Sequence, residues 1–217
     1  DFLARIAEEH EKGRLLLIGT TDIDAREPVI WNMGKIAAAP DHKKALELFR
    51  NILLASAAIP GAFPPTMIQV EVDGKKYEEM HVDGGASTQV FLYPPSMSQL
   101  AKTMEVTMRR PGRVFIIRNS LFRSDWARVE RRTLSIANRA ISSLIHTQGI
   151  GDLYRIYSTT QQDGLEFNLA YIDDGFQAEH TVEFDPVFMK KLFDYGYQLA
   201  KPGYPWKHAP PGLQSAV

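Results

Sequence analysis

The residues best suited to chemistry in this chain are Asp83, Gly84 and Gly85, which directly follow the strand-like segment ending in His81 and Val82. Glycine lets a backbone turn sharply and lets another chain or a ligand approach closely. In a layered α/β sheet, functional groups gather outside the carboxyl ends of the strands. The pattern therefore predicts a carboxylate that projects from a tight turn, where it could act as a base or orient one. An ordinary turn is the alternative, because Asp-Gly is a common turn dipeptide.

A nucleophile to match this carboxylate is missing. No Gly-x-Ser-x-Gly elbow occurs in the 217 residues, and the spacing of that elbow is what positions the serine of many hydrolases. Ser56 and Ser87 both lack the second elbow glycine. We therefore assign neither serine a nucleophilic role, and we expect Ser56 to pack against or cap the end of a helix.

Four segments in a fixed order carry a resemblance to a known family. They are Leu15–Asp22, Pro28–Asn32, the block Ala-Ser-Ala-Ala-Ile-Pro-Gly-Ala-Phe-Pro-Pro at 55–65, and Val-Asp-Gly-Gly at 82–85. Over about residues 13–95 the chain resembles the patatin-like phospholipases. The Asp-Gly-Gly element is weakly specific alone, and the block at 55–65 is what makes it specific.

The resemblance implies a lipid acyl hydrolase with a serine–aspartate dyad and neither a metal nor an organic cofactor. Asp83 would be the catalytic acid of the dyad, Gly84 and Gly85 would shape its turn, and the substrate would be an acyl lipid or phospholipid. Family members carry the serine elbow and a glycine-rich oxyanion loop N-terminal to these segments, and this chain has neither. We therefore expect the C-terminal part of a catalytic domain that is inactive alone. The alternative is a non-catalytic lipid- or partner-binding domain that has lost its nucleophile.

Several other polar residues favour structural roles. His81, two residues before Asp83, is interpreted as a structural or rim histidine, and the other histidines show no metal-ligand spacing. Asp22-Ile23-Asp24 reads as a solvated turn, although the same pattern occurs at metal–nucleotide sites of transferases. Glu78 and Glu79 should point to opposite faces of a strand, so they do not form a catalytic pair.

The expected elements alternate between helices and strands, which indicates an α/β class with a layered sheet. The family resemblance implies a sheet of the patatin-like acyl hydrolase type, incomplete at its N-terminal side. Residues 1–201 are expected to form the C-terminal part of that catalytic domain, and residues 202–217 a Pro/Gly-rich extended tail. Helices are predicted over 2–12, 41–58, 96–108, 124–147 and 185–201, and a further helical stretch runs to 157 after a break at 149–151. Strands are predicted over 15–21, 28–33, 67–72, 76–82, 113–119 and 166–172.

Composition excludes some classes of protein and partner. The 25 basic and 26 acidic residues nearly cancel, so the charge favours no nucleic-acid partner. The chain has no cysteine, which excludes disulfides and thiolate metal sites, and no run reaches the roughly 20 apolar residues of a membrane span. The sequence also predicts a basic amphipathic helix from Asp125. This helix either packs against the core or contacts an anionic membrane surface. The start at Asp1 without methionine or signal peptide suggests a fragment, so we assign no location. The residues also do not indicate the substrate head group, the acyl-chain length or the oligomeric state.

Overall fold

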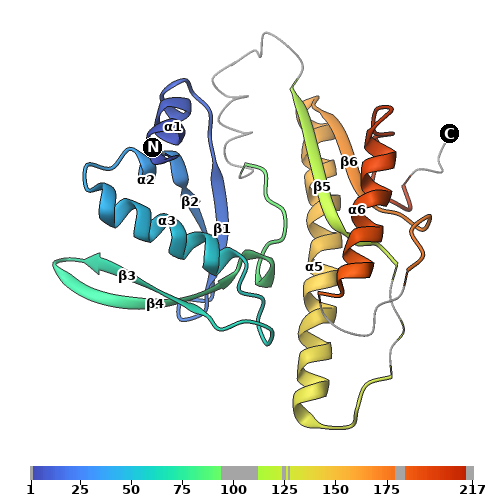
Figure 1. Cartoon of the computed structure of the whole chain (residues 1–217), viewed down its shortest axis with the longest axis horizontal. Coiled ribbons are helices and arrows are strands. Elements are labelled where there is room, and N and C mark those ends of the chain that lie inside the picture. The colour runs from blue at the N-terminus through green and yellow to red at the C-terminus, as the bar shows by residue number, and fades with distance from the viewer. Residues whose placement is uncertain (1, 94–111, 124–125, 127, 179–183, 214–217) are drawn as a thin grey trace. The chain divides into compact units, whose positions relative to one another are not determined.

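A computed structural model describes residues 2–93, 112–123, 126, 128–178 and 184–213, so the helix predicted over 96–108 lies outside the described residues. The chain divides into two compact units, which are treated separately below. The first consists of residues 1–91 and 129–152, and the second of residues 92–128 and 153–217 (Figure 1).

The first unit contains an antiparallel four-stranded sheet in the order β2-β1-β4-β3. Its strands are β1 (Leu17–Asp22), β2 (Glu27–Asn32), β3 (Thr66–Val72) and β4 (Lys75–Asp83). The predicted hairpin around Asp73 and Gly74 is confirmed, and both residues have positive φ, 51° and 73°, as a primed two-residue turn requires. The sheet is antiparallel because two hairpins supply all four strands, β1 with β2 and β3 with β4.

Three helices complete the core of this unit: α1 (Phe2–Glu11), α2 (Met33–Ala37) and α3 (His42–Ser56). The predicted cap of α3 is confirmed, because the Asp41 side chain accepts a hydrogen bond from the Lys44 backbone N–H at 3.1 Å. The buried core consists of Leu3, Met33, Ala37, Ala45, Phe49, Ile52, Ala55 and Ile68. Partly buried residues of the sheet, Ile18, Trp31 and Val70, pack against it, and strand alternation places all three on the same face as Ile68.

The sequence expectation for β1 is wrong, and the solvated turn expected at 22–24 is found for Ile23 and Asp24 but not for Asp22. The run from Leu15 was expected to be buried on both faces, but Leu15 and Leu16 precede the strand and are 66% and 44% exposed. Burial instead increases along β1 toward its carboxyl end, where Thr20, Thr21 and Asp22 are buried. The polar end of the strand, not its apolar start, therefore lies in the interior.

The long helix α5 (Thr133–Asp163) corrects two further predictions. It was expected to begin at Ser124 or Asp125, yet the described residues before Thr133 are not helical. Trp126, the large apolar side chain of that stretch, is 90% exposed and so offers no buried face to stabilise a helix. The helix also continues through Gly149 and Gly151, where a break was expected.

No candidate membrane-spanning helix occurs among the described residues.

The second unit is built on a parallel pair of strands, β5 (Arg113–Leu121) and β6 (Glu166–Ile172). The last described helix, α6 (Pro186–Ala200), begins after the predicted cap Asp185, whose carboxylate accepts from the Val187 and Phe188 backbone N–H groups. Lys207 in the Pro/Gly-rich segment pairs with Leu169 of β6 through two backbone hydrogen bonds. The chain is thus an α/β protein, and its described residues form one antiparallel sheet and one parallel pair of strands.

Candidate functional site

Asp83 is the last residue of β4 and caps a short 3₁₀ turn, η1 (Gly84–Ala86). Its side-chain Oδ1 accepts a hydrogen bond from the Gly85 backbone N–H at 2.7 Å. Its own N–H donates to the Ala58 carbonyl at 3.0 Å, and its carbonyl accepts from the Thr21 hydroxyl at 3.0 Å. The sequence thus correctly placed a carboxylate on a tight turn at the end of a strand, and both backbone and side chain are fixed there.

Electrostatics keep this carboxyl group less acidic than usual. Burial raises the pKa of Asp83, and the hydrogen bond from the Gly85 N–H opposes that shift only in part. No hydrogen bond to the second side-chain oxygen, Oδ2, is found among the described residues. The group therefore has an oxygen free to accept a proton, which is what a general base needs.

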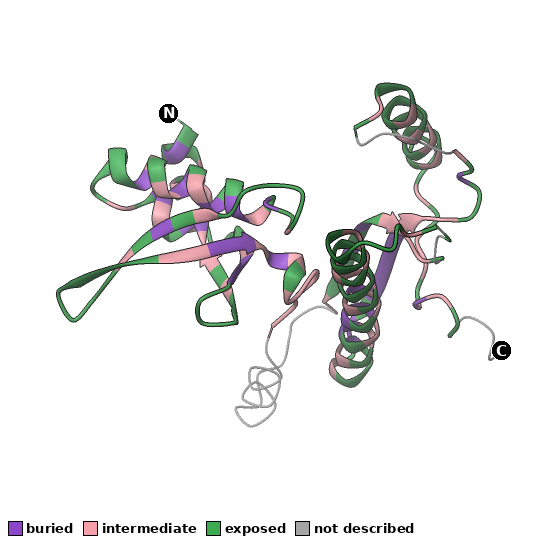
Figure 2. Ribbon diagram, turned by 90° about the horizontal axis from the view of Figure 1, so that it is seen from below, coloured by how far each residue is buried: buried purple, intermediate pink, exposed green. Residues whose placement is uncertain are grey.

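Gly84 and Gly85 shape the turn through close approach and not through a left-handed backbone. Neither has a positive φ. A Cβ added to Gly84 would lie 2.7 Å from the Gly19 carbonyl oxygen of β1, a distance that real side chains do not reach. A Cβ on Gly85 would lie 3.0 Å from the Asp83 carboxylate. Both glycines therefore let the turn sit tightly, and Figure 2 shows buried residues at the end of β4 and in η1.

The segment after this turn is anchored to α5 by residues that the sequence analysis missed. The Asp152 carboxylate, fully buried, accepts from the Gln89 backbone N–H at 2.8 Å. Gln148 donates to the Ser87 carbonyl at 3.1 Å, and the Gln89 side chain donates to the Ile145 carbonyl at 3.0 Å. A Cβ on Gly149 would collide with the Gln89 amide. The glycine that was interpreted as a helix break is therefore the place where the loop docks on the helix.

Neither serine considered in the sequence analysis contacts the Asp83 carboxylate through a hydrogen bond. The Ser87 hydroxyl is bonded to the Thr21 hydroxyl at 2.8 Å and lies 3.4 Å from the Gly84 carbonyl oxygen. Ser56 is the last residue of α3. The Asp83 carboxylate therefore has no hydroxyl partner among the described residues.

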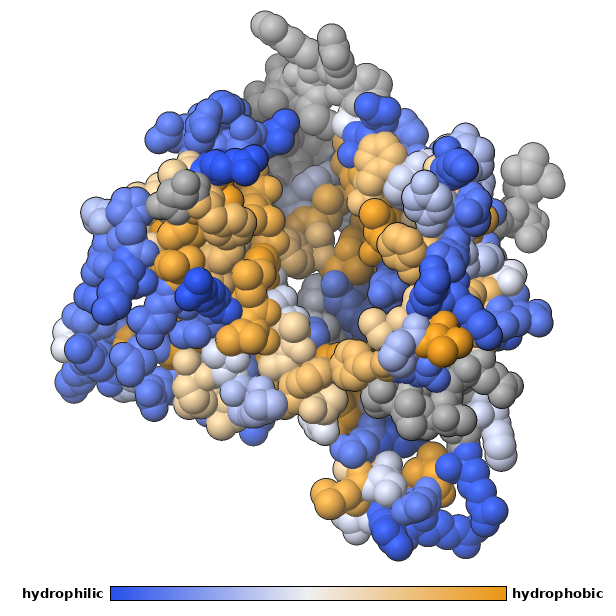
Figure 3. Space-filling model, viewed as in Figure 1, coloured by the Kyte–Doolittle hydropathy of each residue, from blue (hydrophilic) through white to orange (hydrophobic). Residues whose placement is uncertain are grey.

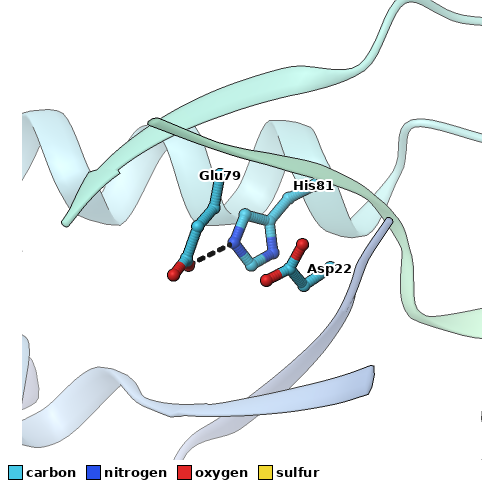
Figure 4. A group of neighbouring side chains, drawn as sticks. All are labelled: Asp22, Glu79 and His81. Carbon is cyan, nitrogen blue, oxygen red and sulfur yellow. Dashed lines mark hydrogen bonds and ion pairs between the residues drawn. The ribbon is translucent and has the colours of Figure 1, made fainter. Parts of the chain in front are cut away.

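A second group of polar side chains lies on β1 and β4. Asp22, Glu79 and His81 each offer a ligand atom within 4.8 Å of the others, and Figure 4 shows the His81 ring beside both carboxylates. Strand pairing sets Asp22 opposite His81, and alternation puts Glu79 on the same face. Sequence reasoning missed this group because it treated Asp22 as part of a solvated turn, whereas that residue is only 5% exposed.

These three side chains could hold a divalent cation, but hydrogen bonds within the fold already explain why they lie together. The His81 ring, fully buried, contacts the Thr20 hydroxyl through Nδ1 at 3.0 Å and the Glu79 carboxylate through Nε2 at 3.3 Å. The Asp22 carboxylate accepts from the backbone N–H groups of Asp24 and Ala25. His81 also packs edge-on against Trp31, whose indole N–H donates to Thr20. These contacts support the structural role predicted for His81.

The remaining carboxylates near β4 have positions set by the local turn or strand. Asp24 accepts from the Met80 backbone N–H at 2.9 Å and so ties the β1–β2 turn to β4. Glu78 and Glu79 point to opposite faces, as predicted, because their partners on β3 are the adjacent residues Gln69 and Ile68. Asp22 and Asp24, like Asp83, accept hydrogen bonds through one carboxylate oxygen, so Asp83 is set apart by its position on the turn that Gly84 and Gly85 form.

Comparison with known proteins gives no family or relative to guide the assignment. No family model, no curated protein and no solved structure matches the chain.

Proposed function

We propose that Asp83 is the acid–base residue of a serine–aspartate lipid acyl hydrolase of the patatin-like type. The observation that carries the proposal is the Asp83 carboxylate, fixed on η1 by the Gly85 N–H and left with Oδ2 unbonded within the described part of the chain. Its raised pKa suits a proton acceptor. The residue blocks at 55–65 and 82–85 support the same family.

In this mechanism the Asp83 carboxylate takes the proton of a serine hydroxyl as the serine oxygen attacks the carbonyl carbon of a lipid ester. The ester C–O bond breaks, Asp83 returns the proton to the leaving alcohol, and an acyl-serine remains. Water then attacks the acyl-serine while Asp83 accepts its proton. The fatty acid leaves, and the proton returns to the serine oxygen. Asp83 thus handles one proton in each half of the reaction.

The proposal needs a nucleophilic serine that these 217 residues do not present in an elbow. Asp83→Asn in the full-length gene product, assayed on a short-chain ester, is therefore the test. Loss of a general base costs about 10²–10⁴-fold in rate. Asp73→Asn is the matched control, because Asp73 is exposed at the β3–β4 turn and asparagine also tolerates its positive φ. Turnover by Asp83→Asn equal to that of Asp73→Asn would refute the assignment.

One observation favours the alternative, a non-catalytic lipid- or partner-binding domain: the hydroxyl nearest in sequence, Ser87, is bonded to Thr21 and not to the Asp83 carboxylate. In that case the full-length protein would hydrolyse no ester but would still bind its lipid or partner. The apolar side chains Leu134, Ile136 and Leu144 on α5 are exposed and would be the surface to test with lipid vesicles. Figure 3 shows hydrophobic residues among hydrophilic ones on the side of the molecule that Figure 1 views.

A further inference from the structure

Arg118 is a buried cation on the covered face of β5. Along this strand Phe115 and Ile117 are 50% and 78% exposed, whereas Ile116 and Arg118 are each 5% exposed. This alternation is that of a strand with one face in the interior and one in solvent. An arginine therefore occupies a position where the strand pattern calls for an apolar side chain.

Within the described part of the chain, the Arg118 guanidinium has no hydrogen-bond partner. Its three nitrogens, Nε, Nη1 and Nη2, are all buried and unbonded, although together they carry five N–H donors. The contact found for the group is with the Phe122 ring, whose centroid lies 4.8 Å from the guanidinium carbon. A cation–π contact offsets only part of the cost of burying a charge. Burial also lowers the pKa of Arg118, yet arginine keeps its proton in proteins.

The carboxylates that follow the partner strand β6 are already engaged. Asp173 accepts hydrogen bonds from the Tyr195 hydroxyl and from the Gly175 backbone N–H. Asp174 lies 3.9 Å from the guanidinium of Arg123. Neither is hydrogen-bonded to Arg118, so the two acids that directly follow β6 do not pair with its charge.

The place of Arg118 in the strand pair suits a ligand. It pairs with Tyr171 of β6 as the last regular pair before a register shift between Arg118 and Leu121. It therefore stands near the carboxyl ends of two parallel strands, which is where open α/β sheets bind their ligands. Phe122 packs edge-on against Tyr171, with ring centroids 4.7 Å apart, and so supports the face on which the guanidinium rests.

We propose that Arg118 binds an oxyanion, a phosphate or a carboxylate group of a ligand, which completes the hydrogen bonding of its guanidinium. The planar fork of N–H donors matches two oxygens of such a group at once. A free phosphate, a soluble carboxylate or a lipid headgroup could supply these oxygens. The site is independent of the role proposed for Asp83.

The test measures the melting temperature of the full chain while inorganic phosphate or propionate is added at constant ionic strength, with chloride as reference. Binding should raise the melting temperature by about 3–6 °C at ten times the dissociation constant. Arg118→Met should abolish this response and, because it removes an unpaired buried charge, should raise the melting temperature without anion. The control is Arg113→Met, because Arg113 also lies over a phenylalanine ring on β5 but is exposed; it should respond as the wild type does.

A second measurement keeps the proposal testable if Arg118→Met does not fold. The guanidinium Nε–H resonance of Arg118 in the wild type should shift on addition of phosphate while that of Arg113 stays in place. If soluble anions have no effect, sedimentation with phosphatidylglycerol vesicles that is lost in Arg118→Lys assigns the oxyanion to a lipid headgroup. A response retained in Arg118→Met, or no response to phosphate, propionate and vesicles alike, would overturn the proposal.

Discussion

The ends of β4 and β5 bury ionisable side chains in opposite ways. At the end of β4, His81 and Asp22 are almost fully buried, and each has hydrogen-bond partners within its own unit. At the end of β5, Arg118 is buried to the same degree, yet its three guanidinium nitrogens have no hydrogen-bond partner among the residues that the structure describes. Folding alone explains the first arrangement, because the partners are part of the fold. It does not explain the second, which therefore points to a group from outside the strand pair.

Asp83 resembles Asp22 in that each accepts backbone N–H donors through one carboxylate oxygen. Asp83 differs in lying on the turn that Gly84 and Gly85 form. The other buried nitrogen without a partner in the described residues is Nε2 of His146 on α5. An imidazole ring can carry one nitrogen without a proton. Leaving that nitrogen without a hydrogen-bond partner therefore costs far less free energy than burying a guanidinium group without partners. A buried nitrogen without a hydrogen-bond partner therefore indicates a missing ligand only when it belongs to a charged group.

The largest effect on stability is expected from Gly84→Ala. Its methyl group would meet the Gly19 carbonyl oxygen, a backbone atom that cannot move without shifting β1. We expect a loss of about 2–3 kcal/mol in the free energy of unfolding, typical of overpacking, measured by urea denaturation. Gly74→Ala is not a suitable control because of its positive φ. Gly151→Ala is suitable, since nothing lies within 4 Å of its added Cβ.

His81→Ala should cost about 2 kcal/mol, because it leaves a cavity and removes a hydrogen-bond partner from Thr20 in the interior. If the group of Asp22, Glu79 and His81 is structural, zinc should leave the melting temperature of the wild type unchanged. Glu79→Gln and Glu78→Gln should then behave alike toward zinc. A zinc-dependent rise that Glu79→Gln removes and Glu78→Gln keeps would show that the group binds metal.

A smaller difference in stability is expected between two glycine variants of α5. Gly151→Ala should stabilise the helix by about 1 kcal/mol, the usual gain of alanine over glycine in a helix interior. Gly149→Ala should give no net gain, because its methyl group displaces the Gln89 side chain from the Ile145 carbonyl and the loss of about 1 kcal/mol offsets the helix gain. Equal stabilisation by both variants would show that Gln89 does not dock on the helix.

The smallest effect is the pH dependence that Asp83 contributes to stability. Because the pKa of Asp83 is raised in the folded state, the folded protein holds this proton more tightly than the unfolded chain does. The contribution of the residue to stability is therefore greatest below the unfolded pKa of about 3.9 and decreases as pH rises through the folded value. Asp83→Asn should be free of this decrease. Identical pH–stability curves for Asp83→Asn and the wild type would contradict the raised pKa.

Local signals made much of the fold predictable from the sequence. Asp41 and Asp185 marked helix starts, Asp73-Gly74 marked a hairpin, and alternation separated Glu78 from Glu79. The sequence also placed Asp83 on its turn, because an acid before two glycines constrains only its neighbours. These features depend on residues within a few positions of one another, which a single sequence displays directly.

What the sequence could not reveal depends on residues far apart in the chain. The burial of Asp22 follows from its pairing with His81, and Gly149 makes sense only once Gln89 lies against it. The same holds for Arg118, because the spacing of β5 residues does not show which face of the strand is covered. Tertiary contacts decided each case where local propensity failed.

The acid limb of the pH–rate profile tests the role of Asp83 most directly. In the full-length protein, kcat/KM for a short-chain ester should fall as pH is lowered, with a midpoint above the ordinary aspartate value of about 3.9, since the base must be ionised to accept the serine proton. Asp83→Asn should retain only a residual rate without this limb, while Asp73→Asn keeps the wild-type profile. A full-length Asp83→Asn enzyme with the wild-type rate and the same acid limb would contradict the account.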